Sequence, residues 1–321
     1  MIPKDHAAKV WEKNGQTSEF ILLGVSDLTH YRIPLSLLFL IIYLTTLAGN
    51  LLILFLVNSD SHLQTPMYFF LGNLSVLDTS IPSISVSHLS FANFSGKIPV
   101  LYSTCLAQVF FFSWFAYTEF FLLAVMSYDR YVAICLPLHY TTKISIQLCI
   151  QLVSSVWIFS SAYSLMHTLC TLRLVFCDST TIPGFFCELY QLIELSCSDT
   201  YLNYLLIFVV GIPFALIAFS ITFLSYVYIF KTILRIKMKD GRQKAFSTCS
   251  SHLTVVFLFY VTTFFNYIQP KAEDLLVGRL VSILYTFFTP LLNPVIYSLR
   301  NSELKGALCR ALVKGKRIVS S

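Results

Sequence analysis

Charged residues are scarce in this chain of 321 residues, since Asp, Glu, Lys and Arg together make up only 12%. Soluble globular domains carry roughly 25% of these four residues, so the chain cannot cover a water-facing surface of its size. Apolar residues make up 56% of the chain, which also excludes disorder, because disordered segments are poor in apolar residues. The composition alone predicts an integral membrane protein.

The motifs of common enzyme classes are missing as well. The chain has no HExxH, no GxSxG, no Walker loop and no GxGxxG. It also shows no repeated halves with paired broken helices, which are typical of secondary transporters. We therefore expect neither an enzyme nor a bound cofactor.

What the chain does have is a series of long apolar runs. A helix needs about 20 mainly apolar residues to cross the hydrocarbon core of a membrane. Seven runs qualify, near Pro34–Val57, Pro66–His88, Tyr102–Val132, Gln147–His167, Asn203–Phe230, Ala245–Ile268 and Leu276–Leu299. No alternation over about ten residues repeats along the chain, so a membrane barrel is not expected. The prediction is an all-α bundle of seven membrane helices over residues 34–300, with an N-terminal segment 1–33 and a C-terminal tail 301–321.

The positions of Lys and Arg predict the orientation, because these residues are enriched in cytoplasmic loops. With the N-terminus outside, fourteen of the 22 basic residues fall on the cytoplasmic side. The net charge of +6 is then mostly a stripe beside the membrane, so the expected partner is lipid and not nucleic acid. We expect a multi-pass protein of the plasma membrane with its C-terminus in the cytoplasm, and no cleaved signal peptide.

Four of the nine cysteines fall on the predicted outer side, at Cys105, Cys177, Cys187 and Cys197. Disulfides persist in that oxidising environment. Four cysteines allow three pairings, and the spacing alone does not choose among them.

Two acidic residues lie inside predicted spans, where ionisable groups are costly and usually functional. At 1.5 Å per residue, Asp78 and Glu119 lie about 18 and 16 Å from the inner ends of their helices, and so at similar depth. Asn50 and Asn293 belong to the inner halves of the first and last spans. Two interpretations stay open: a hydrogen-bonded structural cluster, or a sodium or proton site formed by these four residues and coupled to a switch.

An Asp–Arg pair, Asp129 and Arg130, stands at the inner end of the third span within the run Met126–Cys135. Such a pair is locally neutral at the membrane edge. It can hold one conformation and release Arg130 in another.

Ordered motifs extend nearly from end to end. They include Phe20–Gly24, Gly49–Asn50, Pro66–Leu71, Met126–Cys135, Ser196–Asp199, Lys244–Leu253 and Leu292–Asn301. In this order the chain resembles the odorant (olfactory) receptors, a branch of the rhodopsin-like G-protein-coupled receptors. The chain departs from the family pattern at three places. It lacks the usual N-terminal sequon at Asn14, has Glu188 in place of the usual Asp, and has Val261 where Gly is common.

The resemblance implies a fold, a partner and a set of switch residues. We expect a short cytoplasmic helix near Asn301–Val313, the disulfides Cys105–Cys187 and Cys177–Cys197, and a stimulatory-type G protein that raises cyclic AMP. The family's activation residues correspond here to Asp129, Arg130, Tyr131, Tyr226, His252, Asn293, Pro294 and Tyr297.

The ligand is expected in the outer halves of the helices. Helical spacing places Phe112, Ser113, Ala116 and Tyr117 on one face of the third span. The remaining candidates are Gly211, Phe214, Tyr260, Thr263, Phe264, Tyr267 and Thr286. An apolar cavity with a few hydroxyls suits a small, volatile, weakly polar molecule. Aminergic receptors carry Asp where Phe112 stands, so a cationic amine is not expected.

Two further expectations concern glycosylation and function. Asn93 begins the sequon that we expect to carry a glycan, since the sequon at Asn73 lies inside the second span. The predicted function is an odorant-activated receptor. The alternative is a receptor of the same architecture for an endogenous metabolite outside the olfactory epithelium, and a transporter or intramembrane enzyme is the third class.

Overall fold

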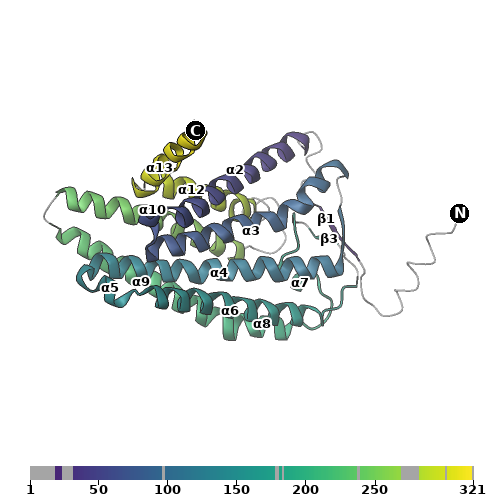
Figure 1. Cartoon of the computed structure of the whole chain (residues 1–321). Coiled ribbons are helices and arrows are strands. Elements are labelled where there is room, and N and C mark those ends of the chain that lie inside the picture. The colour runs from purple at the N-terminus through teal and green to yellow at the C-terminus, as the bar shows by residue number, and fades with distance from the viewer. Residues whose placement is uncertain are drawn as a thin grey trace.

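Helices account for nearly all of the described part of the chain (Figure 1). The computed structural model describes residues 19–23, 32–95, 98–177, 181–182, 184–236, 239–268, 282–300 and 302–319. The long helices are α2 (Arg32–Ser59), α3 (Pro66–Ser95), α4 (Tyr102–Cys135), α6 (Ile146–Thr171), α9 (Ile212–Arg235), α10 (Lys239–Ile268), α12 (Thr289–Arg300) and α13 (Ser302–Val319). Short helices are α5 (Tyr140–Lys143), α7 (Leu189–Leu195) and α8 (Tyr201–Leu206).

The predicted spans coincide with these helices, although several helices run further than their apolar cores. The second continues past His88 to Ser95, and the sixth begins at Lys239 instead of Ala245. The seventh is described from residue 282 onward, where a π-turn (Leu284–Phe288) leads into α12. The C-terminal helix α13 extends to Val319, beyond the expected end at Val313.

Four helices among the described residues are both long and apolar enough to cross a membrane by themselves: Ile33–Ser59, Tyr102–Cys135, Ile146–Thr171 and Tyr201–Arg235. The other three are more polar or shorter. Helix α3 carries the carboxyl of Asp78, and α10 begins with the charged run at Lys239. These helices depend on their neighbours in the bundle to bury their polar groups.

Proline and a serine cap set several helix boundaries. Helix α3 begins at Pro66, whose missing N–H would be unpaired there in any case. Helix α4 ends at Cys135. The next residue, Leu136, precedes Pro137, and a residue followed by proline disfavours helical backbone. The Ser145 hydroxyl accepts from the Leu148 N–H at 3.2 Å and caps the start of α6.

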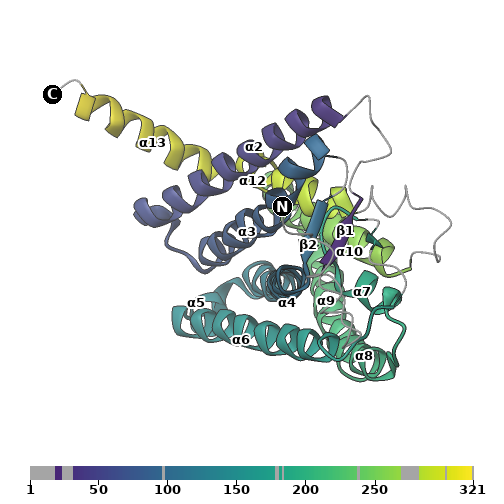
Figure 2. The ribbon, with the colours of Figure 1, turned by 90° about the vertical axis from the view of Figure 1, so that its right-hand side faces the viewer.

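A three-stranded sheet closes one end of the bundle, which we call the sheet end (Figure 2). Its middle strand is β1 (Glu19–Leu22), which pairs antiparallel with β2 (Ile98–Leu101) and parallel with β3 (Thr181–Ile182). The side chains of Phe20 and Leu22 are fully buried. The sequence did not predict this sheet, because each strand has only two to four residues.

Two disulfides hold the loop that precedes α8 at the sheet end. Cys105 in the first turn of α4 is bonded to Cys187, and Cys177 is bonded to Cys197. Both pairs are those that the resemblance implied. The remaining five cysteines are free thiols.

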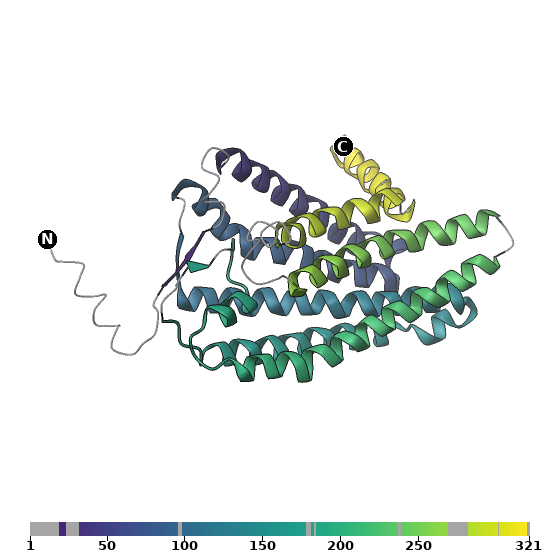
Figure 3. The same cartoon turned by 180° about the vertical axis from the view of Figure 1, so that it is seen from behind.

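Helix α4 lies in the middle of the bundle, against α3, α6 and α9 (Figure 2). Helix α12 runs beside α10, on the side of the molecule that faces the viewer in Figure 3. Helix α13 leaves the bundle at the end opposite to the sheet, which we call the α13 end (Figure 1). The bundle thus has two chemically distinct ends, with disulfides and strands at one and Arg130 toward the other.

Candidate functional site

The buried residues Asp129 and Arg130 and the half-buried Tyr140 lie together toward the α13 end, and we call them the Arg130 cluster. Arg130 donates from Nε to Asp129 Oδ2 at 3.0 Å, and its Nη2 donates to the same oxygen. The Tyr140 hydroxyl donates to Asp129 Oδ1 at 2.8 Å. Burial and the neighbouring negative charge of Asp129 raise the pKa of Tyr140, so its hydroxyl stays protonated and remains a donor. Arg130 is 9% exposed, and its guanidinium is held by its own neighbour in the sequence.

A small cavity, about the size of a single water molecule, opens beside this cluster. Its walls are formed by Met67, Phe70, Met126, Asp129, Arg130, His252 and Tyr297. The Tyr297 hydroxyl and His252 Nε2 are buried and have no hydrogen-bond partner in the described part of the chain. Four predicted switch residues therefore meet around one space, on helices that are distant in the sequence.

Two other predicted switch residues lie next to this cavity in different ways. The Tyr226 hydroxyl on α9 is 2.5 Å from His252 Nδ1 on α10, so a hydrogen bond joins these two helices. Tyr131 is half-buried outside the cavity, with its ring 5.8 Å from that of Tyr228 on α9.

In the middle of the bundle, one hydrogen-bonded pair joins α3 to α12. Asn293 Nδ2 donates to both carboxylate oxygens of Asp78 at 3.0 Å. Asn50 Nδ2 instead donates to the carbonyl oxygens of Thr46 and Pro290, at 3.1 and 3.2 Å. Glu119 is 1% exposed, interacts electrostatically with Asp78, and leaves its Oε1 without a partner. The four predicted residues are thus buried, but the amide of Asn50 is committed to the backbone.

No metal centre of the usual composition accompanies these four residues, since the described residues contain no group of three or more His, Cys, Asp or Glu that could hold an ion.

The predicted switch residue Pro294 of α12 lies close to Gly49 of α2. A Cβ atom at Gly49 would lie 3.1 Å from Pro294 Cβ, so the absent side chain lets α2 and α12 approach each other.

Part of the predicted ligand set gathers beneath the loop near the sheet end. The Phe112 ring is 4.5 Å from Phe186 of that loop and 5.8 Å from Tyr285. Ser113, which follows Phe112 in α4, and Thr286, which follows Tyr285 in the π-turn, are both buried. The Thr286 hydroxyl has no partner among the residues that the structure describes.

Residues of α10 and α4 form a second part, deeper in the bundle. The Tyr260 ring is 5.2 Å from Phe120, and its hydroxyl is 3.4 Å from the hydroxyl of Thr222. The Thr263 hydroxyl is buried without a partner, and Ala116 packs against the central core. Phe264 and Tyr267 belong to α10, but their side chains lie outside the described part of the structure.

The remaining predicted ligand residues lie where α4, α6 and α9 meet. The Tyr117 ring is 4.8 Å from Tyr163 of α6, and a Cβ atom at Gly211 would lie 2.4 Å from the Tyr163 hydroxyl. Phe214 is 40% exposed, and its ring is 4.6 Å from Phe159. The predicted ligand residues therefore do not form one cluster, because Tyr117 turns toward α6 while Phe112 turns toward the loop.

Comparisons with known proteins show which family the chain belongs to. The sequence profile described as "Olfactory receptor" matches residues 39–315. Olfactory receptor 1E16 of Mus musculus is 45% identical over 93% of this chain and 96% of its own length. Olfactory receptor 1J2 of Homo sapiens is 46% identical over 92% of this chain and 95% of its own length. This chain belongs to the olfactory receptor family.

The fold has a solved counterpart as well. The crystal structure of squid rhodopsin superimposes with a TM-score of 0.68 at 18% sequence identity, and the match covers 88% of this chain and 86% of rhodopsin. The olfactory receptor is therefore a multi-pass membrane protein with the rhodopsin-like seven-helix fold. It is a G-protein-coupled receptor and not an enzyme.

Several contacts of this olfactory receptor escaped the sequence analysis. Gln108 of α4 accepts from the Cys187 N–H at 2.9 Å and donates to the Ile84 carbonyl at 3.1 Å. Glu188, next along the chain, accepts a hydrogen bond from the Ser282 hydroxyl. The expected disulfide at Cys187 was the one sequence signal for these contacts, because it places the residues beside Cys187 at the sheet end of the bundle.

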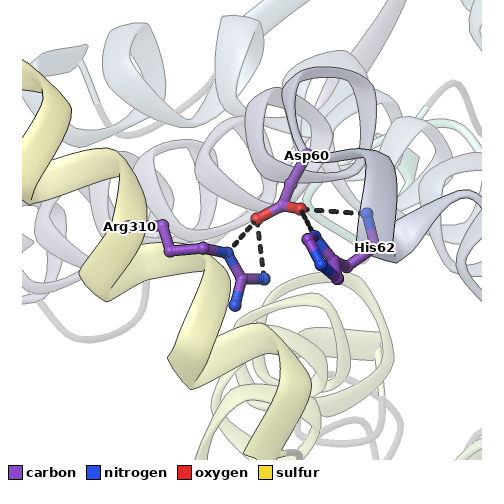
Figure 4. A network of polar contacts seen from close by, with 3 residues as sticks. All are labelled: Asp60, His62 and Arg310. Carbon is purple, nitrogen blue, oxygen red and sulfur yellow. Dashed lines mark hydrogen bonds and ion pairs between the residues drawn. The ribbon is translucent and has the colours of Figure 1, made fainter.

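A further polar network fastens α13 to the turn between α2 and α3 (Figure 4). Arg310 donates from Nε and Nη2 to Asp60 Oδ2, both at 2.7 Å. The backbone N–H of His62 donates to Asp60 Oδ1 at 3.0 Å, and the His62 ring contacts the same oxygen. The hydrogen bond from Arg310, followed by that from the His62 backbone, lowers the pKa of Asp60 from 3.8 to about 2.

The two sequons differ in their surroundings. Asn73 accepts a hydrogen bond from Trp157 Nε1 at 3.3 Å, which places it between helices of the olfactory receptor. Asn93 lies in the last turn of α3, and its side chain is outside the described part.

Proposed function

We propose that small volatile odorants activate this olfactory receptor and that it couples to a stimulatory-type G protein, which raises cyclic AMP. The observation that supports this most is the Arg130 cluster beside its cavity. A buried guanidinium is costly unless it is paired. Here its partner is a side chain that can keep or release it, next to the unpartnered groups of His252 and Tyr297.

We place the N-terminus outside the cell, the C-terminus in the cytoplasm and the receptor in the plasma membrane. The distribution of Lys and Arg supports this orientation. The two disulfides at the sheet end also favour it, because disulfides persist on the oxidising side of a membrane. Residues 1–33 then form the outer segment, 34–300 the membrane domain and 301–321 the cytoplasmic tail.

The odorant would bind in the half of the bundle that lies toward the sheet end. The walls there are aromatic, with Phe112, Phe186 and Tyr260 among them. The hydroxyls of Thr263 and Thr286 are buried and unpartnered, so they are available to a weakly polar ligand. Such a lining favours neutral molecules with an apolar body.

Binding would act on the switch by a shift of populations. In the active state we expect α10 to move outward at the α13 end, which exchanges the contacts of Tyr226, His252 and Arg130. A ligand changes this equilibrium only by its different affinity for the two states. A shift from 1:99 to 99:1 takes about 5.5 kcal/mol, which is a large demand on a small odorant. The resting state is therefore only modestly favoured.

The buried group of Asp78, Glu119, Asn293 and Asn50 would contribute to this bias. It serves either as a structural cluster or as a sodium or proton site. Basal cyclic AMP measured with sodium replaced by a larger organic cation separates a sodium site from the other two roles.

The test is cyclic AMP production in transfected cells exposed to a broad panel of volatiles. Arg130→Ala should reach the surface normally and give no response, while Tyr260→Ala should change which odorants are effective. Arg173→Ala is the matched control, since it removes the same charge from an exposed position at the sheet end. Normal signalling by the Arg130→Ala receptor at the surface would contradict the proposed switch.

A further inference from the structure

One histidine in the bundle is fully buried and unpaired. His167 of α6 has 0% of its surface exposed, and neither Nδ1 nor Nε2 has a hydrogen-bond partner among the described residues. A neutral imidazole carries one N–H donor and one acceptor nitrogen. Burying both nitrogens unpaired is unfavourable, so such a group calls for a polar partner from outside the chain.

Aromatic rings of two helices surround this imidazole. The Tyr163 ring meets it edge to face at a centroid distance of 4.6 Å. The Tyr117 ring of α4 is 6.4 Å away and packs on Tyr163 at 4.8 Å. The imidazole therefore has aromatic, largely apolar neighbours on α4 and α6.

The third wall belongs to an irregular turn of the fifth span. Tyr163 and His167 are four residues apart, so they point to the same side of α6. The hydroxyl of Tyr163 reaches Gly211, where a Cβ atom would lie only 2.4 Å from it. The side of α6 that carries His167 therefore faces the π-turn Ile207–Gly211. Single π-turns inside helices are frequent at functional sites.

A second unpaired group lies on the helix that faces α6. Asn203 of α8 is 2% exposed, and its Nδ2 has no partner. It stands about two turns before Gly211, on the side of the sheet end. Helix α8 lies beside α6 (Figure 2), so the two unsatisfied polar side chains belong to neighbouring helices.

We propose that His167 is a recognition group for hydroxyl-bearing ligands, in a subsite between α4, α6 and the π-turn Ile207–Gly211. This inference rests on the proposed odorant receptor function and names a ligand class for it. An alcohol or phenol donates one hydrogen bond and accepts another, as the neutral imidazole does. An ether or ketone only accepts, and a hydrocarbon does neither, so only the hydroxyl satisfies both nitrogens.

The experiment measures cyclic AMP in cells that express the full receptor, with probes matched in shape. One series is hexanol, hexyl methyl ether and heptane, and the other is benzyl alcohol, benzyl methyl ether and ethylbenzene. Other volatile classes accompany them. In the wild-type receptor each alcohol should act at a concentration about tenfold lower than its ether, the effect of one net hydrogen bond.

The substitution His167→Phe removes both polar atoms and keeps a ring. It should abolish the difference between alcohol and ether, because the alcohol then loses two hydrogen bonds and the ether loses the one that it accepts. Surface expression should stay the same or rise, because an unpaired polar group has been replaced by an apolar one. His167→Gln keeps a donor and an acceptor and should retain part of the difference. The control is Thr168→Val, whose hydroxyl bonds only to the Ser164 carbonyl within α6.

Each contrary outcome has its own meaning. An unchanged preference for alcohols in His167→Phe would overturn the inference and leave a bound water as the partner of His167. A wild-type receptor that answers to other volatiles but to no alcohol would overturn it too, while the proposed function stands. A receptor that reaches the surface and answers to no volatile would overturn the proposed function and this inference together.

Discussion

Asp129 holds Arg130 through a charged contact that is almost fully buried, and its other oxygen is held by Tyr140. Asp129→Asn should raise cyclic AMP in the absence of ligand about tenfold, because hydrogen bonds to charged groups contribute roughly 1.5–3 kcal/mol. Tyr140→Phe removes one neutral donor to Asp129 and should give a smaller rise. Equal basal activity in all three receptors at matched surface levels would show that this pair does not hold the resting state.

Among the described glycines, Gly211 has the least room for an added side chain. A Cβ atom there would lie 2.4 Å from the Tyr163 hydroxyl. Gly211→Ala should lower the unfolding temperature of the purified receptor, since overpacking typically costs 1–3 kcal/mol. Adding Tyr163→Phe should restore part of the loss.

Gly72 provides the control for this substitution. A Cβ atom at Gly72 would meet Leu54 at 3.8 Å, an ordinary contact, so Gly72→Ala should have little effect. A Gly211→Ala receptor as stable as Gly72→Ala would mean that α6 and α9 separate freely at this point.

At the scale of elements, α13 is fastened to the turn between α2 and α3 by Asp60 and Arg310 (Figure 4). The pKa of Asp60 is lowered to about 2, so its contribution is complete above pH 4 and is lost as the pH falls through 2. The contact should therefore be constant across the physiological range.

Asp60→Asn reproduces the protonated state at neutral pH. It should speed hydrogen exchange of the α13 amides, and Arg310→Ala should do the same. Lys305→Ala removes an equal charge from an exposed position of α13 and serves as the control. Exchange rates that stay unchanged in Asp60→Asn would show that apolar contacts alone hold α13.

The sequence predicted the helices well because a membrane span has a strong signal: about 20 apolar residues in a row. It did not predict the sheet, whose strand β3 has two residues and whose pairing joins segments about 80 residues apart or more. The family motif Phe20–Gly24 marked the middle strand without revealing its structure.

The prediction of site residues had a similar limit. Helical spacing placed Phe112 and Tyr117 on one face of α4, and the structure gives them different neighbours, Phe186 and Tyr163. Long aromatic side chains choose their direction by rotamer and by packing, which periodicity does not encode. The sequence did not predict a role for His167, because the lack of a hydrogen-bond partner becomes visible only when the positions of the surrounding helices are known.

At the scale of the whole molecule, the orientation in the membrane makes a chemical prediction. With the sheet end outside, as proposed, we expect the sequon at Asn93 to lie on the side of the glycosylating enzyme of the lumen. The receptor should give one glycosidase-sensitive band, which both Asn93→Gln and Ser95→Ala remove. A sensitive band that persists in both variants would place the glycan elsewhere, and a wild-type receptor without any glycan would leave the orientation to other tests.

The order of strands in the sheet has a consequence for how the receptor is made. Strand β1 is synthesised first, yet its second neighbour, β3, follows about 160 residues later along the chain. At roughly 5–20 residues per second, β1 must wait for about 8–32 seconds with one edge unpaired. Until then its buried side chains, Phe20 and Leu22, have no complete cover. With the sheet end on the lumenal side, as proposed, we expect the newly made receptor to pass through a period in which β1 is open to chaperones of the secretory pathway.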